Sequence, residues 1–174
     1  MIVVSGSSRT GTSMMMQTLK ELGIPMVAPA FIEGHSNIIK YNRKGFYELE
    51  LEDLLKIKKE HYGKALKVFG AALSLFDISL ISKMIVMVRN KEDAVKSTTE
   101  VYKALNESVD PSFAYDINYE IINMMCKEIS TIFINFEDMI SDPEKEIKKV
   151  VEFLKINNRE EKFNNAVKNI ELCH

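Results

Sequence analysis

Short apolar runs alternate with segments of helical period along most of this chain. The apolar runs predict strands at residues 2–4, 65–69, 83–88 and 131–136. Helices are predicted at residues 13–22, 49–61, 74–82, 90–105, from 111 onward, at 143–154 and in the tail from 159. Strands that alternate with helices form a parallel sheet covered on both faces. The pattern therefore predicts an α/β fold of three layers (α/β/α), with ligands bound beyond the carboxyl ends of the strands.

The boundaries of the later elements carry their own signals. The run at residues 83–88 is continuously apolar after Lys83, which is typical of a central parallel strand. Asn90 is a predicted N-cap, with Asp93 three residues later. Pro143 after Asp142 predicts another helix start, because proline is favoured at the first helical position.

Length and composition limit the classes of protein to which the chain can belong. At 174 residues it fits a single domain, residues 1–174. The formal net charge of −2 argues against binding of nucleic acid by bulk electrostatics. The sequence shows no long apolar run and no signal-peptide pattern, so we expect no membrane span. Cys126 and Cys173 are expected as free thiols, which favours a cytoplasmic location. The sequence does not determine the oligomeric state.

The loop after the first strand has the composition of an anion site. From position 5 it reads Ser-Gly-Ser-Ser-Arg-Thr-Gly-Thr-Ser. Backbone N–H groups of such a loop and of the next helical turn converge, and the helix dipole also favours negative charge. Gly6 and Gly11 have Walker A spacing, but Thr12 stands where that motif needs lysine, and Arg9 is the only cation of the loop. We expect a phosphate-binding loop unlike that of an ordinary ATPase; the alternative is an incidental strand-to-helix turn.

A second cationic position lies at the end of the predicted central strand. Arg89 follows the apolar run directly, and Ser97 comes eight residues later, on the next predicted helix. The carboxyl edge of the sheet also carries the first loop, so we expect both near it. An arginine and a hydroxyl placed in this way can hold a second phosphate. The alternatives are a surface ion pair for Arg89 and a solvent-facing Ser97.

A third stretch completes a resemblance to a known family. Residues 135–143 read Asn-Phe-Glu-Asp-Met-Ile-Ser-Asp-Pro, and the helix after them ends in Phe-Leu-Lys at residues 153–155. With the first loop and the Arg89–Ser97 pair, this resembles the sulfotransferase family that uses 3′-phosphoadenosine-5′-phosphosulfate (PAPS). The resemblance covers roughly residues 2–156. It includes the stretch Gly-Phe-Tyr-Glu at residues 45–48, which bacterial-type members also show.

The resemblance implies a P-loop-like fold and a role for each motif. The first loop would bind the 5′-phosphosulfate through Ser8, Arg9, Thr10, Gly11, Thr12 and Ser13. Arg89 and Ser97 would hold the 3′-phosphate, and Arg9 would also act at the bridging oxygen. The implied reaction is sulfuryl transfer from PAPS to a hydroxyl or amine of a small-molecule or glycan-like acceptor, leaving adenosine 3′,5′-bisphosphate (PAP). The sequence shows no cluster with metal-ligand spacing, and no metal is expected.

The general base is where the sequence departs from the family. Many members carry Lys-x-His near the end of the second strand, and residues 67–69 (Lys-Val-Phe) keep the lysine without the histidine. Other members use a glutamate after the first helix, so Glu48 is the preferred base and Lys67 a second catalytic candidate. Weaker candidates for the base are Glu33, His35 and His61. A carboxylate serves as a base near neutral pH when it is desolvated, which the two aromatic residues before Glu48 favour. The alternative is a solvated charge beside two other glutamates.

The carboxyl-terminal part also differs from the family. Members often end in a basic, glycine-rich segment that holds the 3′-phosphate and adenine, and here Arg159 is the candidate substitute. The acceptor site must come from residues 25–62 and 104–118. Two other interpretations stay open: a nucleotide or small-metabolite kinase with an atypical P-loop, and a catalytically impaired nucleotide-binding module of the same fold.

Overall fold

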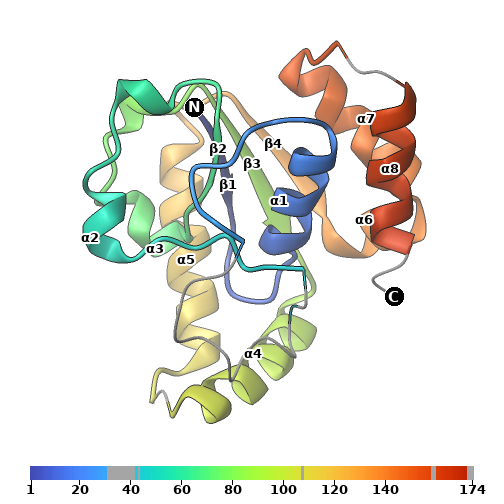
Figure 1. Ribbon diagram of the computed structural model, residues 1–174. Coiled ribbons are helices and arrows are strands. Elements are labelled where there is room, and N and C mark those ends of the chain that lie inside the picture. The colour runs from blue at the N-terminus through green and yellow to red at the C-terminus, as the bar shows by residue number, and fades with distance from the viewer. Residues whose placement is uncertain (31–41, 43, 107, 158–159, 172–174) are drawn as a thin grey trace.

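A parallel sheet forms the centre of the molecule. The computed structural model describes residues 1–30, 42, 44–106, 108–157 and 160–171. Within these ranges the sheet has the strand order β2-β1-β3-β4, and every pair is parallel. The strands are β1 (Ile2–Ser5), β2 (Ala65–Lys67), β3 (Lys83–Val88) and β4 (Thr131–Asn135). As predicted for the run at 83–88, β3 is a central strand, and its carboxyl end lies beside that of β1 (Figure 1).

Helices connect the strands and follow the last of them. They are α1 (Thr12–Glu21), α2 (Leu51–Leu54), the 3₁₀ turn η2 (Lys59–His61), α3 (Gly70–Leu73), the 3₁₀ turn η3 (Ile78–Leu80), α4 (Lys91–Leu105), α5 (Pro111–Met125), α6 (Phe136–Ser141), α7 (Pro143–Leu154) and α8 (Glu160–Glu171). In the part of the chain that is described, none of these helices is long and apolar enough to cross a membrane.

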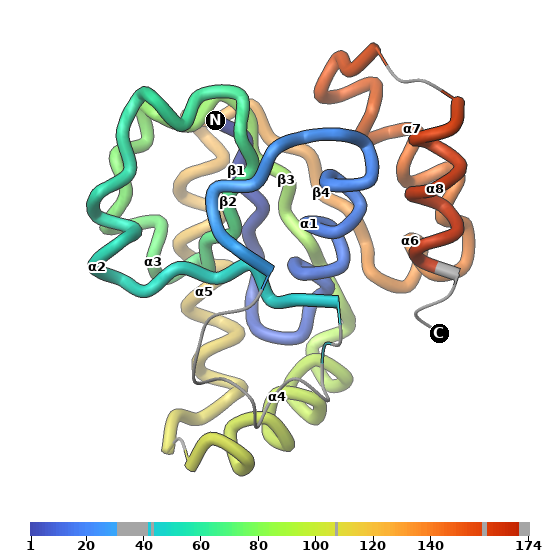
Figure 2. Tube along the Cα trace, viewed as in Figure 1, coloured from blue at the N-terminus to red at the C-terminus, as the bar shows by residue number. Residues whose placement is uncertain are grey.

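Two hydrophobic clusters fill the space on the two faces of the sheet. Successive residues of a strand point to opposite faces, so Val4 and Ile85 join the cluster with α1, α7 and α8. Their neighbours Val3 and Met84 join the other cluster, with α3 and α5. The α1 and α5 helices accordingly lie on opposite sides of the sheet (Figures 1 and 2). The predicted three-layer α/β/α architecture is confirmed.

The predicted starts of α4 and α7 are confirmed in detail. The Asn90 side chain caps α4 by accepting a hydrogen bond from the N–H of Asp93 at 3.2 Å. Pro143 stands at the start of α7, where the Asp142 side chain accepts from the N–H of Lys145 at 3.2 Å. Local side-chain chemistry therefore sets both boundaries.

Two predicted helices are wrong. Only the single turn α2 and the turn η2 form within residues 49–61, because Leu54 is buried there whereas Leu51 and Leu55 are exposed. A helix with so little to bury gains little from packing. Within residues 74–82 only the turn η3 forms, where the Asp77 side chain accepts from the N–H of Ser79; α3 ends before this segment.

The strand ends also differ from the prediction. The β2 strand ends at Lys67 and not at Phe69, and β4 ends at Asn135. The Asn135 side chain accepts from the N–H of Asp138 at 3.0 Å and so caps α6, which the sequence pattern did not predict. The chain therefore passes from β4 into a helix at Phe136, directly at the carboxyl edge of the sheet.

Candidate functional site

The loop between β1 and α1 brings the first turn of α1 to the carboxyl edge of the sheet. Gly11, the N-cap of α1, has φ 94°, in the left-handed region that favours glycine. A β-carbon added there would lie 2.7 Å from Cδ2 of Phe136. The helix begins at Thr12, so the N–H groups of its first turn have no acceptor within the helix, and the dipole favours an anion beside them. This is the strand-loop-helix geometry of an anion site.

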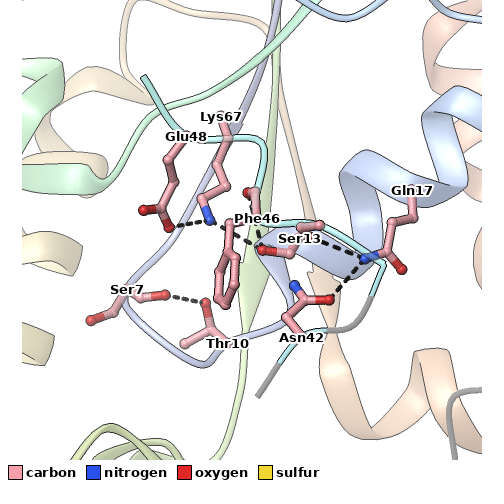
Figure 3. Close-up of polar contacts among 9 residues, drawn as sticks. Ser7, Thr10, Ser13, Gln17, Asn42, Phe46, Glu48 and Lys67 are labelled. Atoms are coloured by element: carbon pink, nitrogen blue, oxygen red, sulfur yellow. Dashed lines mark hydrogen bonds and ion pairs between the residues drawn. The ribbon is translucent and has the colours of Figure 1, made fainter. Parts of the chain in front are cut away.

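Hydroxyl groups of the loop hold its own shape. Thr10 is buried, and its Oγ1 donates to the carbonyl of Ser7 at 2.8 Å (Figure 3). The carbonyl of Ser8 accepts from Thr98 Oγ1 of α4 at 3.3 Å. Thr12 is buried at the start of α1. Thr10 and Ser8 therefore stabilise the loop, and its backbone N–H groups are the natural ligand contacts.

Two arginines meet at this loop from different elements. Arg9 has φ 61°, a left-handed conformation that is uncommon for a residue other than glycine, and its Nε donates to Ser97 Oγ on α4 at 3.0 Å. Arg89, at the end of β3, donates from NH1 to the carbonyl of Arg9 at 3.0 Å. Its guanidinium lies over the Phe136 ring, 4.3 Å from the centroid. The structure therefore brings the three predicted residues Arg9, Arg89 and Ser97 into one cluster.

One donor of this cluster lacks an acceptor. Arg89 Nε is buried and has no hydrogen-bond partner among the described residues. A buried donor without an acceptor costs free energy, more so when the group is charged. A bound anion at this point would supply the acceptor, so the cluster fits a phosphorylated ligand.

The α5 helix carries residues that the sequence did not mark as part of the site. Tyr115 Oη donates to the carbonyl of Arg89 at 2.8 Å, and Tyr119 Oη donates to the carbonyl of Met87 at 2.6 Å. Asn118 Nδ2 donates to Ser7 Oγ at 3.3 Å. Burial raises the pKa of the Tyr119 phenol, which stays a neutral donor. In the sequence Tyr115 and Tyr119 belong to the apolar stripe of this helix, and only the packing of α5 on the sheet shows what their hydroxyl groups contact.

Lys67 and Glu48 form an ion pair beside the first turn of α1. Lys67 Nζ donates to Glu48 Oε1 at 2.6 Å and to Ser13 Oγ at 3.1 Å (Figure 3). The Lys67 side chain is 3% exposed and that of Glu48 is 29% exposed. Burial lowers the pKa of Lys67, Glu48 opposes this shift, and the positive charge of Arg9 adds to it. The two predicted catalytic candidates Glu48 and Lys67, which are distant from the β1–α1 loop in sequence, therefore lie beside it in the structure.

The segment that carries Glu48 is tied to α1. Ser13 Oγ donates to the carbonyl of Phe46 at 3.2 Å, and Gln17 Nε2 donates to the carbonyl of Gly45 at 3.3 Å and to Asn42 Oδ1 at 3.1 Å (Figure 3). Ser13 and Gln17, which are four residues apart and so lie on one face of α1, thus hold this segment. The sequence predicts the approach of residues 45–48 to the donor loop through the family resemblance, and the hydrogen bonds give its physical cause.

Comparison with known families identifies the chain. A model of the sulfotransferase domain matches residues 1–174. The chain belongs to this sulfotransferase family. The family membership does not favour the kinase interpretation. Comparison with curated protein sequences gives no match.

Solved structures share the fold of this sulfotransferase-family chain at low sequence identity. Mouse sulfotransferase SULT7A1 complexed with PAP is 16% identical with a TM-score of 0.65, over 99% of this chain and 64% of that chain. Retinol dehydratase in complex with androsterone and inactive cofactor PAP is 15% identical with a TM-score of 0.64, over 98% and 64%. The sulfotransferase domain from the curacin biosynthetic pathway is 16% identical with a TM-score of 0.57, over 92% and 75%. The chain spans less than two thirds of the length of the first two proteins.

The remaining sequence candidates of this sulfotransferase-family chain do not join the site. His61 belongs to η2, which precedes β2, so it lies toward the opposite edge of the sheet from Lys67, and its Nδ1 contacts the backbone of Lys58. Glu33, His35 and Arg159 lie outside the described residues. Across the described ranges, no group of three or more His, Cys, Asp or Glu is placed to hold a metal ion.

Proposed function

We propose that this chain transfers a sulfuryl group from PAPS to a hydroxyl or amine of a small-molecule or glycan-like acceptor and releases PAP. The observation that carries the proposal is the cluster at the start of α1, where Arg89 bonds the loop at Arg9 and keeps a buried Nε without an acceptor in the described structure. The presence of PAP in the solved structures of mouse SULT7A1 and retinol dehydratase supports the choice of nucleotide.

The proposal assigns each part of the donor to residues of the cluster. The N–H groups of residues 10–13, with Ser8 and Arg9, hold the 5′-phosphosulfate, and Arg89 with Ser97 holds the 3′-phosphate. PAPS, when bound, supplies an activated sulfuryl group whose bond to a 5′-phosphate oxygen breaks as the bond to the acceptor forms. Arg9 and Lys67 stabilise the negative charge that develops on the oxygens, as positioned cations do in phosphoryl transfer.

Glu48 is the proposed general base. It takes the proton of the acceptor hydroxyl or amine, the acceptor atom bonds to sulfur, and the electron pair of the broken sulfur–oxygen bond leaves with PAP. Its support is its place: the carboxylate contacts Lys67, and Lys67 contacts Ser13 of the donor loop. The acceptor is proposed to bind along residues 25–62 and 104–118.

Two assays test the proposal. Transfer of radiolabelled sulfate from PAPS to a panel of phenols, alcohols, amines and saccharides should give a labelled product that Glu48→Gln does not form. PAP should raise the unfolding temperature, and ATP with magnesium should raise it less. A preference for ATP would contradict the proposal. Tight PAP binding without transfer to any acceptor would instead indicate a nucleotide-binding module.

The proposed location is the cytoplasm. Cys126 is a free thiol, and reducing compartments keep thiols unpaired. Fractionation of cells that make the protein tests this, and recovery in a secreted or membrane fraction would contradict it.

A further inference from the structure

Lys67 is shared between the proposed base and the proposed donor site. Its ammonium contacts the Glu48 carboxylate on one side and the hydroxyl of Ser13 on the other (Figure 3). Ser13 belongs to the first turn of α1, whose N–H groups form the anion site. One buried cation therefore faces both the carboxylate of this chain and any anion that the loop holds.

We propose that the sulfuryl donor and Glu48 compete for Lys67, so that binding of the donor displaces Glu48 from the ammonium and releases this carboxylate to act as the base. The inference rests on the proposed function and adds an order of events to it. Without donor, the ion pair occupies Oε1 of Glu48. With donor, the oxygen is available to the proton of the acceptor.

The charges of the free protein explain why the pair forms. A buried ammonium needs a counter-charge, and Glu48 supplies it at 2.6 Å. Burial and the positive charge of Arg9 both lower the pKa of Lys67, and Glu48 acts in the opposite direction. An anion bound at the loop supplies the same counter-charge and removes the need for Glu48.

The exposures of the two side chains decide which partner moves. Lys67 is 3% exposed and sits in β2, whereas Glu48 is 29% exposed and precedes α2 in a segment without regular structure. A carboxylate beside an incoming anion is repelled, because like charges close together raise the energy. Glu48 can turn toward water at little cost, and Lys67 stays in the sheet. The donor therefore displaces Glu48 rather than Lys67.

The decisive measurement is the affinity of Glu48→Gln for PAPS. This variant removes the competing charge and keeps an oxygen that accepts from Lys67. We expect the Kd for PAPS, measured by calorimetry, to fall about three- to tenfold while transfer is lost. Glu152→Gln removes the same charge from an exposed position of α7 and should leave the Kd within about twofold of the wild-type value.

A double variant shows whether the effect passes through Lys67. In Lys67→Met the further change Glu48→Gln should bring no gain in PAPS affinity, because the shared cation is gone. A gain that persists would mean that Glu48 repels the donor directly, and it would overturn the exchange. So would a folded Glu48→Gln protein that binds PAPS no more tightly than the wild type.

A measurement on the wild-type protein does not depend on any variant. Carbodiimide labelling of Glu48, read by peptide mass spectrometry, should become faster when PAPS is bound, with the labelling of Glu152 as the internal reference. An unchanged or slower rate at Glu48 would overturn the exchange. A wild-type protein that neither binds PAPS nor transfers sulfate would instead refute the proposed function.

Discussion

Replacement of Arg89 by lysine separates the charge of this residue from its shape. In the structure NH1 donates to the carbonyl of Arg9, the guanidinium lies 4.3 Å from the Phe136 centroid, and Nε is buried with no acceptor in the described part of the chain. An ammonium keeps the charge but does not reproduce these positions together. A hydrogen bond from a charged group contributes about 1.5–3 kcal/mol. Loss of one such contact to the nucleotide corresponds to a Kd for PAP that is roughly ten- to hundredfold higher.

The assay is calorimetric titration of PAP into wild-type protein, Arg89→Lys and Arg89→Met. We expect Arg89→Lys to bind weakly and Arg89→Met to bind still more weakly, because the methionine also lacks the charge. Urea unfolding of each variant gives the share of the loss that comes from the loop itself. If Arg89→Lys bound PAP within about twofold of the wild type, the guanidinium geometry would have no role in nucleotide binding and the reasoning would be refuted.

Three further predictions concern the supports of the loop. Gly11→Ala should lower the free energy of unfolding by roughly 1–3 kcal/mol more than Gly63→Ala: both glycines have positive φ, but an added β-carbon meets Phe136 only at Gly11. Equal losses in urea titrations would contradict the contact. Tyr119→Phe leaves the carbonyl of Met87 without its phenol donor and should cost about 1–3 kcal/mol and weaken PAP binding; the exposed Tyr62→Phe is the control. Burial lowers the pKa of Lys67 in the folded protein below its ordinary value of 10.5. Between the folded-state pKa and 10.5 the unfolded chain therefore binds more protons than the folded chain. The wild type should accordingly gain stability relative to Lys67→Met as the pH rises toward 10.5. A stability difference that does not change with pH would refute this last prediction.

The sheet and the arginine cluster were accessible from the sequence for physical reasons. Strands buried on both faces must be apolar, so runs such as 83–88 stand out. An arginine directly after such a run has to lie at the carboxyl edge, where the loop with Arg9 also lies. The meeting of Arg9, Arg89 and Ser97 follows once β1 and β3 are known to be parallel neighbours in the sheet.

Other parts of the site depend on contacts that no periodicity encodes. The family resemblance indicates Glu48 and Lys67 as candidates, and the pattern of the sequence does not indicate that they form a pair. Tyr115 and Tyr119 occupy apolar positions of a helix, and their hydroxyl groups find carbonyls only after α5 packs on the sheet. The failed helices at 49–61 and 74–82 have the same origin, because short segments at the periphery follow their tertiary contacts more than their propensity.

The position of Phe136 limits which amino-acid substitutions this site can accept during evolution. Its ring lies under the guanidinium of Arg89 and against the space that a side chain at Gly11 would need. Residues from three distant parts of the chain therefore constrain one another through a single aromatic ring. Substitutions at these positions should be non-additive, and a transplant of the loop into another scaffold would need the strand end and the aromatic residue to travel with it.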